Sequence, residues 1–400
     1  MPRLTWRQKT YLDARLLQAQ TLLVVTKLSL LILYNRLFSV TSFRIVNYVL
    51  IAIILQPHSL ACIPLANYTL PPAIAGSRIL YQSANFNSDA TPTSAVVLFP
   101  YAPRRLADGT VPVVVWAHGT SGLYANAAPS HLRNMWQYYM APFPLVLQGY
   151  VVVMPDYAGL GVSVDGRGHP IVHEYLASPA AAKDLEYSFK ATREAFPFAG
   201  PKFVVIGHLQ GDHMKPVLAA GALPGMENIF PDFKINSILT PEGVARLQPD
   251  KDVGGNVAIT AALFFSADLF KPGWEDNAYM QRFQSLTSTG GMPVAGPMLL
   301  IQGESDALIS HAVTTAAAER TSKACPEVSI QYVRYANVSY GLTMWVSQRL
   351  WLEWTEDRFE GKEVEVELRL ERVEPLRPAG AYVPEMNWYL AKGMESYHTP

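Results

Sequence analysis

The stretch FVVIGHLQGDH, residues 203–213, decides the fold of this chain. Its first four residues are apolar and mostly β-branched, which is typical of a buried strand. The glycines at Gly207 and Gly211 allow a tight turn directly after that strand. The residues that follow have helix-like composition. The stretch therefore predicts a strand, a sharp turn and a helix in direct succession.

A strand, turn and helix of this kind form the nucleophile elbow of serine hydrolases, where the turn reads G-x-S-x-G and exposes the serine. Here the central residue is Leu209. A leucine side chain has no proton to lose and no lone pair for attack. The sequence therefore predicts a hydrolase-like architecture that lacks the atom needed for nucleophilic attack.

Further apolar runs extend this pattern on both sides of the elbow. They predict strands at 94–99, 111–117, 150–154, 203–206, 298–301 and 329–335, and helical spacing covers 179–196 and 343–359. Continuous apolar strands that alternate with helices are typical of a mostly parallel sheet covered on both faces. We therefore expect an α/β fold with a mostly parallel central sheet flanked by helices.

Two segments depart from the alternation. Residues 215–297 are rich in Gly, Pro and Phe with short helical pieces, and we expect them to form an inserted cap of the kind that covers a substrate site. Residues 362–372 alternate charged and apolar side chains and are followed by several prolines. We expect this tail to wrap over the surface.

Composition limits the classes of partner. Of the 400 residues, 50% are hydrophobic and 16% are charged, which fits a globular protein with a large core. The net charge of −1 and the lack of a basic block argue against nucleic acid as a partner. The two cysteines, Cys62 and Cys325, have no metal-binding spacing. We therefore predict neither a metal nor a cofactor.

The N-terminal region is apolar and basic. The run at 45–55 has the length of the hydrophobic part of a signal peptide, and Ser59-x-Ala61 is a suitable cleavage site. It is shorter than the ~20 residues that span a bilayer. We therefore expect residues 1–61 to be a signal peptide or signal anchor and residues 62–400 to be the hydrolase-like domain.

Entry into the secretory pathway would leave the protein secreted or anchored to a membrane through its N-terminal apolar region. The alternative is an amphipathic extension that packs on the domain or lies on a membrane. Asn67 and Asn337 each begin an N-x-S/T sequence and are candidate glycosylation sites.

Several stretches together resemble the fungal secretory-lipase-like α/β-hydrolases. They are WAHGTSG (116–122), PDYAGLG (155–161), HEYLASPAAAKDLEYS (173–188), GHLQGDH (207–213), ILTPEG (238–243), GPMLLIQGESDALIS (296–310) and YANVSYGLTMWVSQRLWLEW (335–354). The resemblance covers most of residues 80–390. It implies the α/β-hydrolase fold and a Ser-His-Asp triad, whose positions can be read from this sequence.

The resemblance places the triad acid at Asp306, with Glu304 as the alternative. The triad histidine belongs after the last strand, in a segment that here reads Asn337-Val338-Ser339-Tyr340. Tyr340 therefore replaces the histidine, and a phenol with a reference pKa near ~10 is a poor general base at neutral pH. The nucleophile and base positions are both changed, whereas the acid remains.

The resemblance also implies an oxyanion site made of backbone N–H groups. The donors would be the amide of Gly119 or Thr120, in the turn after the strand at 111–117, and the amide of Gln210. Asp212 stands where the family tends to have a small residue. If its carboxylate pointed inward, it would oppose stabilisation of an oxyanion.

Other residues near the strand ends could supply a substitute nucleophile. Ser121 and Ser305 are examples, but no pairing with a histidine is evident from the sequence. His208 should point away from the site and pack behind the turn.

Three functions remain open. In the first, the protein binds a hydrophobic small molecule such as a fungal secondary metabolite, with or without transforming it, and does not hydrolyse it. In the second, it is a lipase-like or esterase-like hydrolase with a relocated nucleophile. In the third, it is an inactive pseudoenzyme that acts through binding or interaction.

Overall fold

The computed structural model describes residues 63–64, 68–132, 135, 138–208, 216–264 and 266–382. The predictions for residues 1–61 and Asn67 therefore lie outside the described residues. The same holds for Leu209, Gln210 and Asp212 of the predicted elbow. Residues 164–170 do not belong to the main compact unit, and an antiparallel bridge joins Val164 to Pro170.

The larger sheet has six strands in the order β1-β2-β3-β5-β4-β6. Their bounds are β1 Ile63–Pro64, β2 Ile74–Ala84, β3 Ala90–Pro100, β4 Val111–Ala117, β5 Val151–Pro155 and β6 Ala199–Gly207. Strand β4 pairs in parallel with β5 and β6, whereas β3 is antiparallel to β2 and β5. The parallel centre is made by the buried valine-rich strands β4 and β5.

A second sheet contains β7 (Met298–Gly303), β8 (Ile330–Tyr335) and β9 (Leu368–Val373), all parallel. Strand β9 lies in the tail that we expected to wrap over the surface, so that expectation was wrong for these residues. Its alternation of apolar and charged side chains is the pattern of a strand with one face exposed. Leu370, for example, is 47% exposed.

The strand before the predicted elbow, β6, lies at an edge of the six-stranded sheet. It pairs with β4 on one side, and no described strand pairs with its other side. Phe203 and Val205 are 45% and 47% exposed as a result. Strand β7 is likewise paired only with β8 within the described residues. The two sheets are thus separated between β6 and β7.

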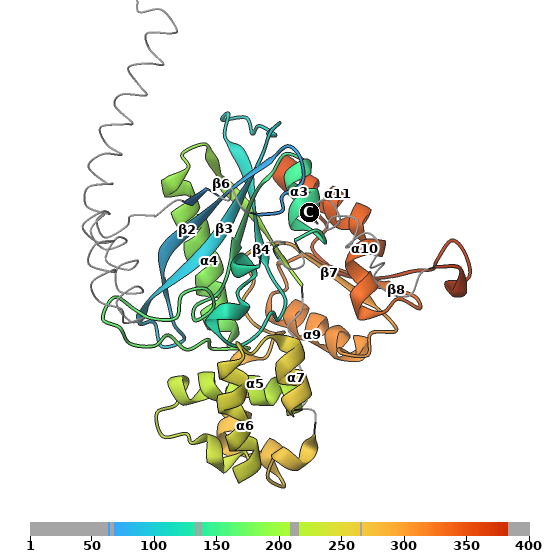
Figure 1. Ribbon diagram of the computed structural model, residues 1–400. Coiled ribbons are helices and arrows are strands. Elements are labelled where there is room, and N and C mark those ends of the chain that lie inside the picture. Colours follow the sequence, from blue (N-terminus) through green and yellow to red (C-terminus); the bar gives the residue numbers. More distant parts are fainter. Residues whose placement is uncertain are drawn as a thin grey trace, which may run out of the picture. The chain divides into compact units, whose positions relative to one another are not determined.

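Helices cover both faces of the six-stranded sheet, as predicted (Figure 1). Phe189 of α4 (Ser178–Ala195) packs against the valines of β4 and β5 on one face. Trp351 and Phe359 of α11 (Gln348–Glu360) join Trp116 in the core on the other face. That second core also contains α3 (Pro142–Leu147) and α10 (Thr343–Val346).

Helix α9 (His311–Ala324) covers the smaller sheet, where Ala318 packs with Ile330 and Tyr332. Short 3-10 turns occupy Ala125–Ala127, Pro129–His131, Ile235–Ser237, Ala267–Leu269, Trp274–Asp276, Tyr340–Leu342 and Ala379–Ala381. No helix in the described ranges combines the length and apolar character needed to cross a bilayer.

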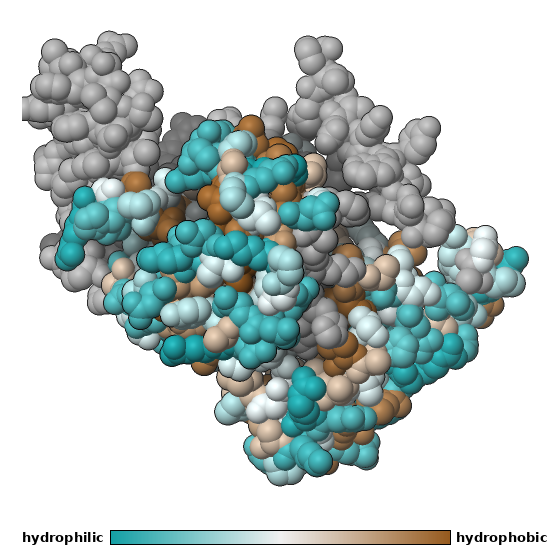
Figure 2. Space-filling view, turned by 90° about the horizontal axis from the view of Figure 1, so that it is seen from below, coloured by the Kyte–Doolittle hydropathy of each residue, from teal (hydrophilic) through white to brown (hydrophobic). Residues whose placement is uncertain are grey.

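The interval predicted as a cap is helical. It contains α5 (Pro216–Ile229), α6 (Pro241–Asp252), α7 (Val257–Phe264) and α8 (Ala278–Thr287), which lie together in Figure 1. Phe233, Phe264 and Phe283 are almost fully buried in a core that these helices share with Tyr175. In the view of Figure 2, hydrophilic side chains dominate the surface and hydrophobic ones gather in smaller patches between them.

Candidate functional site

His208 and Tyr340 form a stacked pair where β6 and β8 end. His208 follows the last residue of β6, and its backbone N–H donates to the carbonyl of Ala117 at 3.1 Å. Tyr340 begins the 3-10 turn after β8. Its hydroxyl oxygen lies 3.2 Å from His208 Nδ1, and the two rings are 4.8 Å apart and nearly parallel. Trp116 of β4 stacks over the same imidazole at 6.5 Å.

Burial keeps both members of this pair neutral at neutral pH. It lowers the pKa of His208 to about 4, and the nearby charge of Asp306 acts in the opposite direction. Burial also raises the pKa of Tyr340 far above its usual value, with smaller contributions from Asp306 and Tyr175. His208 Nε2 is buried and has no hydrogen-bond partner among the residues that the structure describes. The pair therefore provides neutral hydrogen-bonding groups with one unused ring nitrogen.

Asp306 lies in the loop after β7, close enough for its charge to affect both rings. Its Oδ1 accepts backbone N–H groups from Leu308 at 2.8 Å and Ile309 at 2.9 Å. The carboxylate therefore also shapes its own turn. Glu304, the alternative acid, accepts instead from Arg372 Nε at 2.9 Å. Of these two acids, Asp306 is the one that lines the cavity described next.

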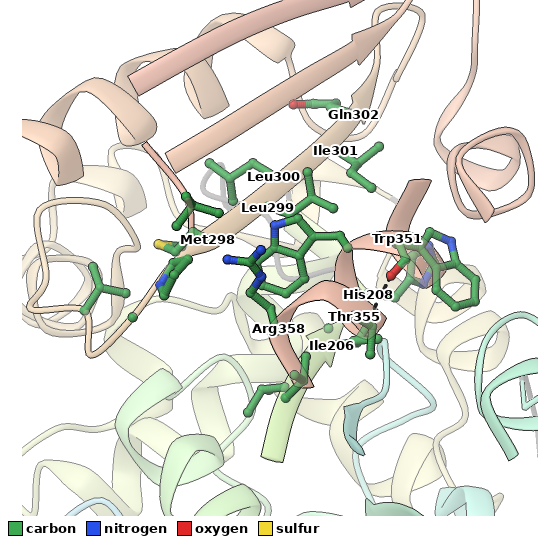
Figure 3. A pocket seen from close by; sticks show the side chains of 18 of the residues that line it. Ile206, His208, Met298, Leu299, Leu300, Ile301, Gln302, Trp351, Thr355 and Arg358 are labelled. Atoms are coloured by element: carbon green, nitrogen blue, oxygen red, sulfur yellow. Dashed lines mark hydrogen bonds between the residues drawn. The ribbon is translucent and has the colours of Figure 1, made fainter. Parts of the chain in front are cut away.

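A cavity of about 920 Å³ occupies the separation between β6 and β7. Helix α11 forms a further wall, and Figure 3 shows side chains from these elements around it. Aliphatic and aromatic side chains make up most of the wall, including Ile206, Met298, Leu299, Leu300, Ile301, Trp351 and Trp354. His208, Asp306 and Tyr340 are among the polar residues of the wall, an arrangement that suits an apolar molecule with a polar group to orient.

The turn that carries Gly119 and Thr120 follows β4, as predicted, but does not line this cavity. Thr120 Oγ1 is 2.7 Å from the hydroxyl of Tyr175. Tyr175 in turn affects the pKa of Tyr340, so the turn lies in the neighbourhood of the stacked pair. The structure thus brings Asp306 and Tyr340 to one cavity and leaves the predicted oxyanion turn beside it.

The position of His208 differs from our expectation. We expected it behind the turn and away from the site, yet it contacts Tyr340 and lines the cavity. The reason is the missing partner on the outer edge of β6, which leaves the end of that strand open to the cavity. Sequence reasoning also missed Trp354 and Arg358 on α11. Their i, i+4 spacing was a usable signal, because it places both on one helix face.

The remaining predicted position is Asn337, which is exposed and has a left-handed backbone with φ of 59°. Its exposure leaves room for a glycan. Within the described ranges, no group of three histidine, cysteine or carboxylate side chains could hold a metal ion.

Comparison with known proteins relates the chain to others through structure. No family model and no curated protein matches its sequence. Candida antarctica lipase A in its closed state matches with a TM-score of 0.56 and 13% identity, over 84% of this chain and 89% of the lipase. A second structure of that lipase gives 0.57 and 14%, with the same coverage.

A mutant of the rice cell wall degrading esterase LipA from Xanthomonas oryzae matches with a TM-score of 0.53 and 15% identity. The match covers 78% of this chain and 95% of the esterase. At these identities the likeness concerns the fold alone. The parallel strands, flanking helices and structural neighbours together show that the chain has the α/β-hydrolase fold found in lipases and esterases.

Proposed function

We propose that this protein binds a hydrophobic small molecule in the cavity between β6 and β7 and does not hydrolyse esters with a Ser-His-Asp triad. The observation that carries this proposal is the combination of an apolar cavity with the neutral His208–Tyr340 pair in its wall. A neutral imidazole and a neutral phenol can orient a carbonyl or hydroxyl group on a ligand.

The absence of acyl transfer is supported by the residues at the triad positions. Leu209 offers no nucleophile. Tyr340 stands at the base position, and its high pKa makes it a poor proton acceptor at neutral pH. Loss of Ser or His in a serine hydrolase costs on the order of 10⁶ in turnover. Changes at both positions therefore favour a binding role over ester hydrolysis.

A relocated nucleophile has no specific observation in its favour. In the described ranges, no serine hydroxyl hydrogen bonds to a histidine ring, and the ring nitrogens of His118 face backbone carbonyls, with Nδ1 2.6 Å from Gly119 O and Nε2 3.4 Å from Asp156 O. Any transformation of the ligand would instead rely on holding it in a reactive shape or on proton exchange with Tyr340 and Asp306.

The first experiment measures binding of Nile red to the purified full chain and its displacement by dodecanol. We expect saturable, displaceable binding, with affinity reduced about 10-fold by Leu299→Gln in the cavity wall. Leu376→Gln is the matched control, because Leu376 is 95% exposed and distant in sequence from the wall. Equal affinities for the two variants and the unmodified chain would contradict the proposed cavity.

The second experiment measures hydrolysis of p-nitrophenyl esters of several chain lengths. We expect the unmodified chain to be inert and Leu209→Ser combined with Tyr340→His to gain activity. Substantial hydrolysis by the unmodified chain that Leu209→Ser leaves unchanged would overturn the non-hydrolytic function.

A further inference from the structure

The cavity between β6 and β7 contains a cation with an unused hydrogen-bond donor. Arg358 on α11 lines the cavity, and its guanidinium carbon lies 5.4 Å from the centre of the Trp354 ring. Its Nε atom is buried and, within the described part of the chain, has no hydrogen-bond partner. In Figure 3 the guanidinium group reaches toward the stretch of β7 that carries Met298 and Leu299.

The acids nearest to Arg358 in sequence are engaged by other cations. Glu356 pairs with Arg104 at 2.5 Å. Asp357 and Glu360 both pair with Lys362, at 2.6 and 3.0 Å. Lys362 is the other basic residue of the cavity wall, so its charge is already balanced.

The acids of the wall also leave Arg358 free. Asp306 and Glu363 line the cavity, but neither forms an ion pair with Arg358. Asp306 is used by the backbone of its own turn, and Glu363 is exposed to solvent. Within the described residues, Arg358 therefore has the Trp354 ring as a contact and no carboxylate as a counter-ion.

Arg358 as a whole is only partly buried, so the rest of its guanidinium group can meet a ligand in the cavity. A guanidinium group presents a planar set of N–H donors that matches the two oxygens of a carboxylate. The side chains of β7 and the tryptophans of α11 that line the rest of the cavity are mostly apolar. Their complement is a molecule with a hydrocarbon body and one carboxylate.

We propose that Arg358 is the anion-binding residue of this cavity and that the ligand is a hydrophobic carboxylate, an aliphatic chain ending in a carboxyl group. This inference rests on the proposed function, because it names the ligand class of the same cavity. The carboxylate meets Arg358, and the hydrocarbon lies against Ile206, Leu299 and Leu300. His208 and Tyr340 remain available for a second, neutral polar group on the ligand.

The test compares dodecanoate with dodecanol and methyl dodecanoate as competitors of Nile red on the full chain at pH 7.5. The three probes share a hydrocarbon chain and differ in the head group. A hydrogen bond to a charged group contributes about 1.5–3 kcal/mol. We therefore expect dodecanoate to bind about 10- to 100-fold more tightly than the two neutral probes, with this preference decreasing as salt is added.

Three variants assign the preference to its residue. Arg358→Gln should remove the preference for dodecanoate while leaving dodecanol binding within about 2-fold. Arg358→Lys should keep part of the preference, since it retains the charge and loses the planar donor set. Arg349→Gln is the control, because Arg349 lies on the same helix, is exposed and already pairs with Glu353.

The outcomes separate the two proposals. If dodecanol and dodecanoate bind equally well, the assignment to Arg358 is wrong while the apolar binding function stands. If none of the probes binds, the proposed function itself fails. A preference for dodecanoate that persists in Arg358→Gln would place the anion site elsewhere. The comparison of the three probes on the unmodified chain tests for a preference for the carboxylate even if Arg358→Gln does not fold.

Discussion

Two buried polar groups of this protein are satisfied in different ways. Asp156, which follows β5, is fully buried and accepts hydrogen bonds from Ser94 Oγ, Ser130 N and Ser130 Oγ at 2.6–3.0 Å. His208, which follows β6, is 8% exposed and uses only its Nδ1, toward Tyr340. Both residues follow strands of the same sheet. The difference indicates that Asp156 connects loops to the sheet, whereas His208 has one ring nitrogen without a partner among the described residues.

The location of the two groups explains the difference. Strand β5 is central and paired on both sides, so every group at its end meets protein atoms. Strand β6 is paired on one side only within the described residues, and the cavity begins at its open edge. The comparison predicts that changes at the first group reduce stability more than changes at the second.

The largest effect is expected from Asp156→Ala. The change leaves the Ser130 N–H and two buried hydroxyls without an acceptor, and it removes the carboxylate 4.0 Å from Arg78. Breaking a buried ionic network by removing one partner costs about 3–5 kcal/mol. Urea denaturation monitored by fluorescence measures the loss. Glu353→Ala, in an exposed pair, is the control and should cost less than about 1 kcal/mol. A similar cost for both variants would contradict the structural role of Asp156.

The second effect concerns pH. Because the pKa of His208 is about 4 in the folded protein and near 6.5 when unfolded, the unfolded chain binds an additional proton between these values. The contribution of the buried, neutral His208 side chain to stability is therefore fully present above pH 6.5 and is lost as the pH falls toward 4. The pKa difference of His208 between the folded and unfolded states corresponds to roughly 3 kcal/mol of unfolding free energy at most.

Other ionisable groups change their protonation over the same pH range. The contribution of His208 must therefore be measured as a difference between the unmodified chain and a His208 variant. The pKa of His173 is also lowered to about 4, whereas burial raises that of Asp184 to about 7, which acts in the opposite sense. Unfolding free energies of the unmodified chain and His208→Gln should be compared at pH 4.5 and 7. We expect the variant to lose less stability on acidification. An equal loss in both proteins would show that His208 is not buried in the neutral state.

A smaller effect is expected from Tyr340→Phe. It removes the hydroxyl that lies 3.2 Å from His208 Nδ1 and keeps the ring stacking. A neutral hydrogen bond contributes about 1 kcal/mol, which denaturation can detect. Tyr101→Phe, at an 88% exposed tyrosine, should have no measurable effect. If Tyr340→Phe is also neutral, the hydroxyl does not hold the pair together.

The sequence predicts much of this fold because burial leaves periodic signals. The valine-rich run at 111–117 coincides with β4, and the helical spacing at 179–196 with α4 to within one residue at each end. The helix predicted at 343–359 is divided at Ser347 into α10 and α11, and periodicity alone does not reveal such a break.

The site is less predictable from the sequence than the fold. Position along the chain suffices to place Asp306 and Tyr340 after neighbouring strands, and both do line one cavity. The open edge of β6 depends on which strand pairs with which, and pairing partners carry no local signal. The position of His208 in the cavity wall follows from that open edge. It could therefore be seen only once the strands were arranged in space.

The smallest stability effect is expected from Arg358→Met, and it gives the sharpest contrast with Asp156→Ala. Methionine retains much of the aliphatic volume packed on Trp354 and removes a buried donor that has no acceptor. Replacing an uncompensated polar group by an apolar one of similar volume is often neutral or stabilising. We expect the unfolding free energy of the ligand-free protein to change by less than about 1 kcal/mol, while added dodecanoate should raise the melting temperature of the unmodified chain more than that of the variant. A large destabilisation by Arg358→Met would mean that Arg358, like Asp156, holds the fold together.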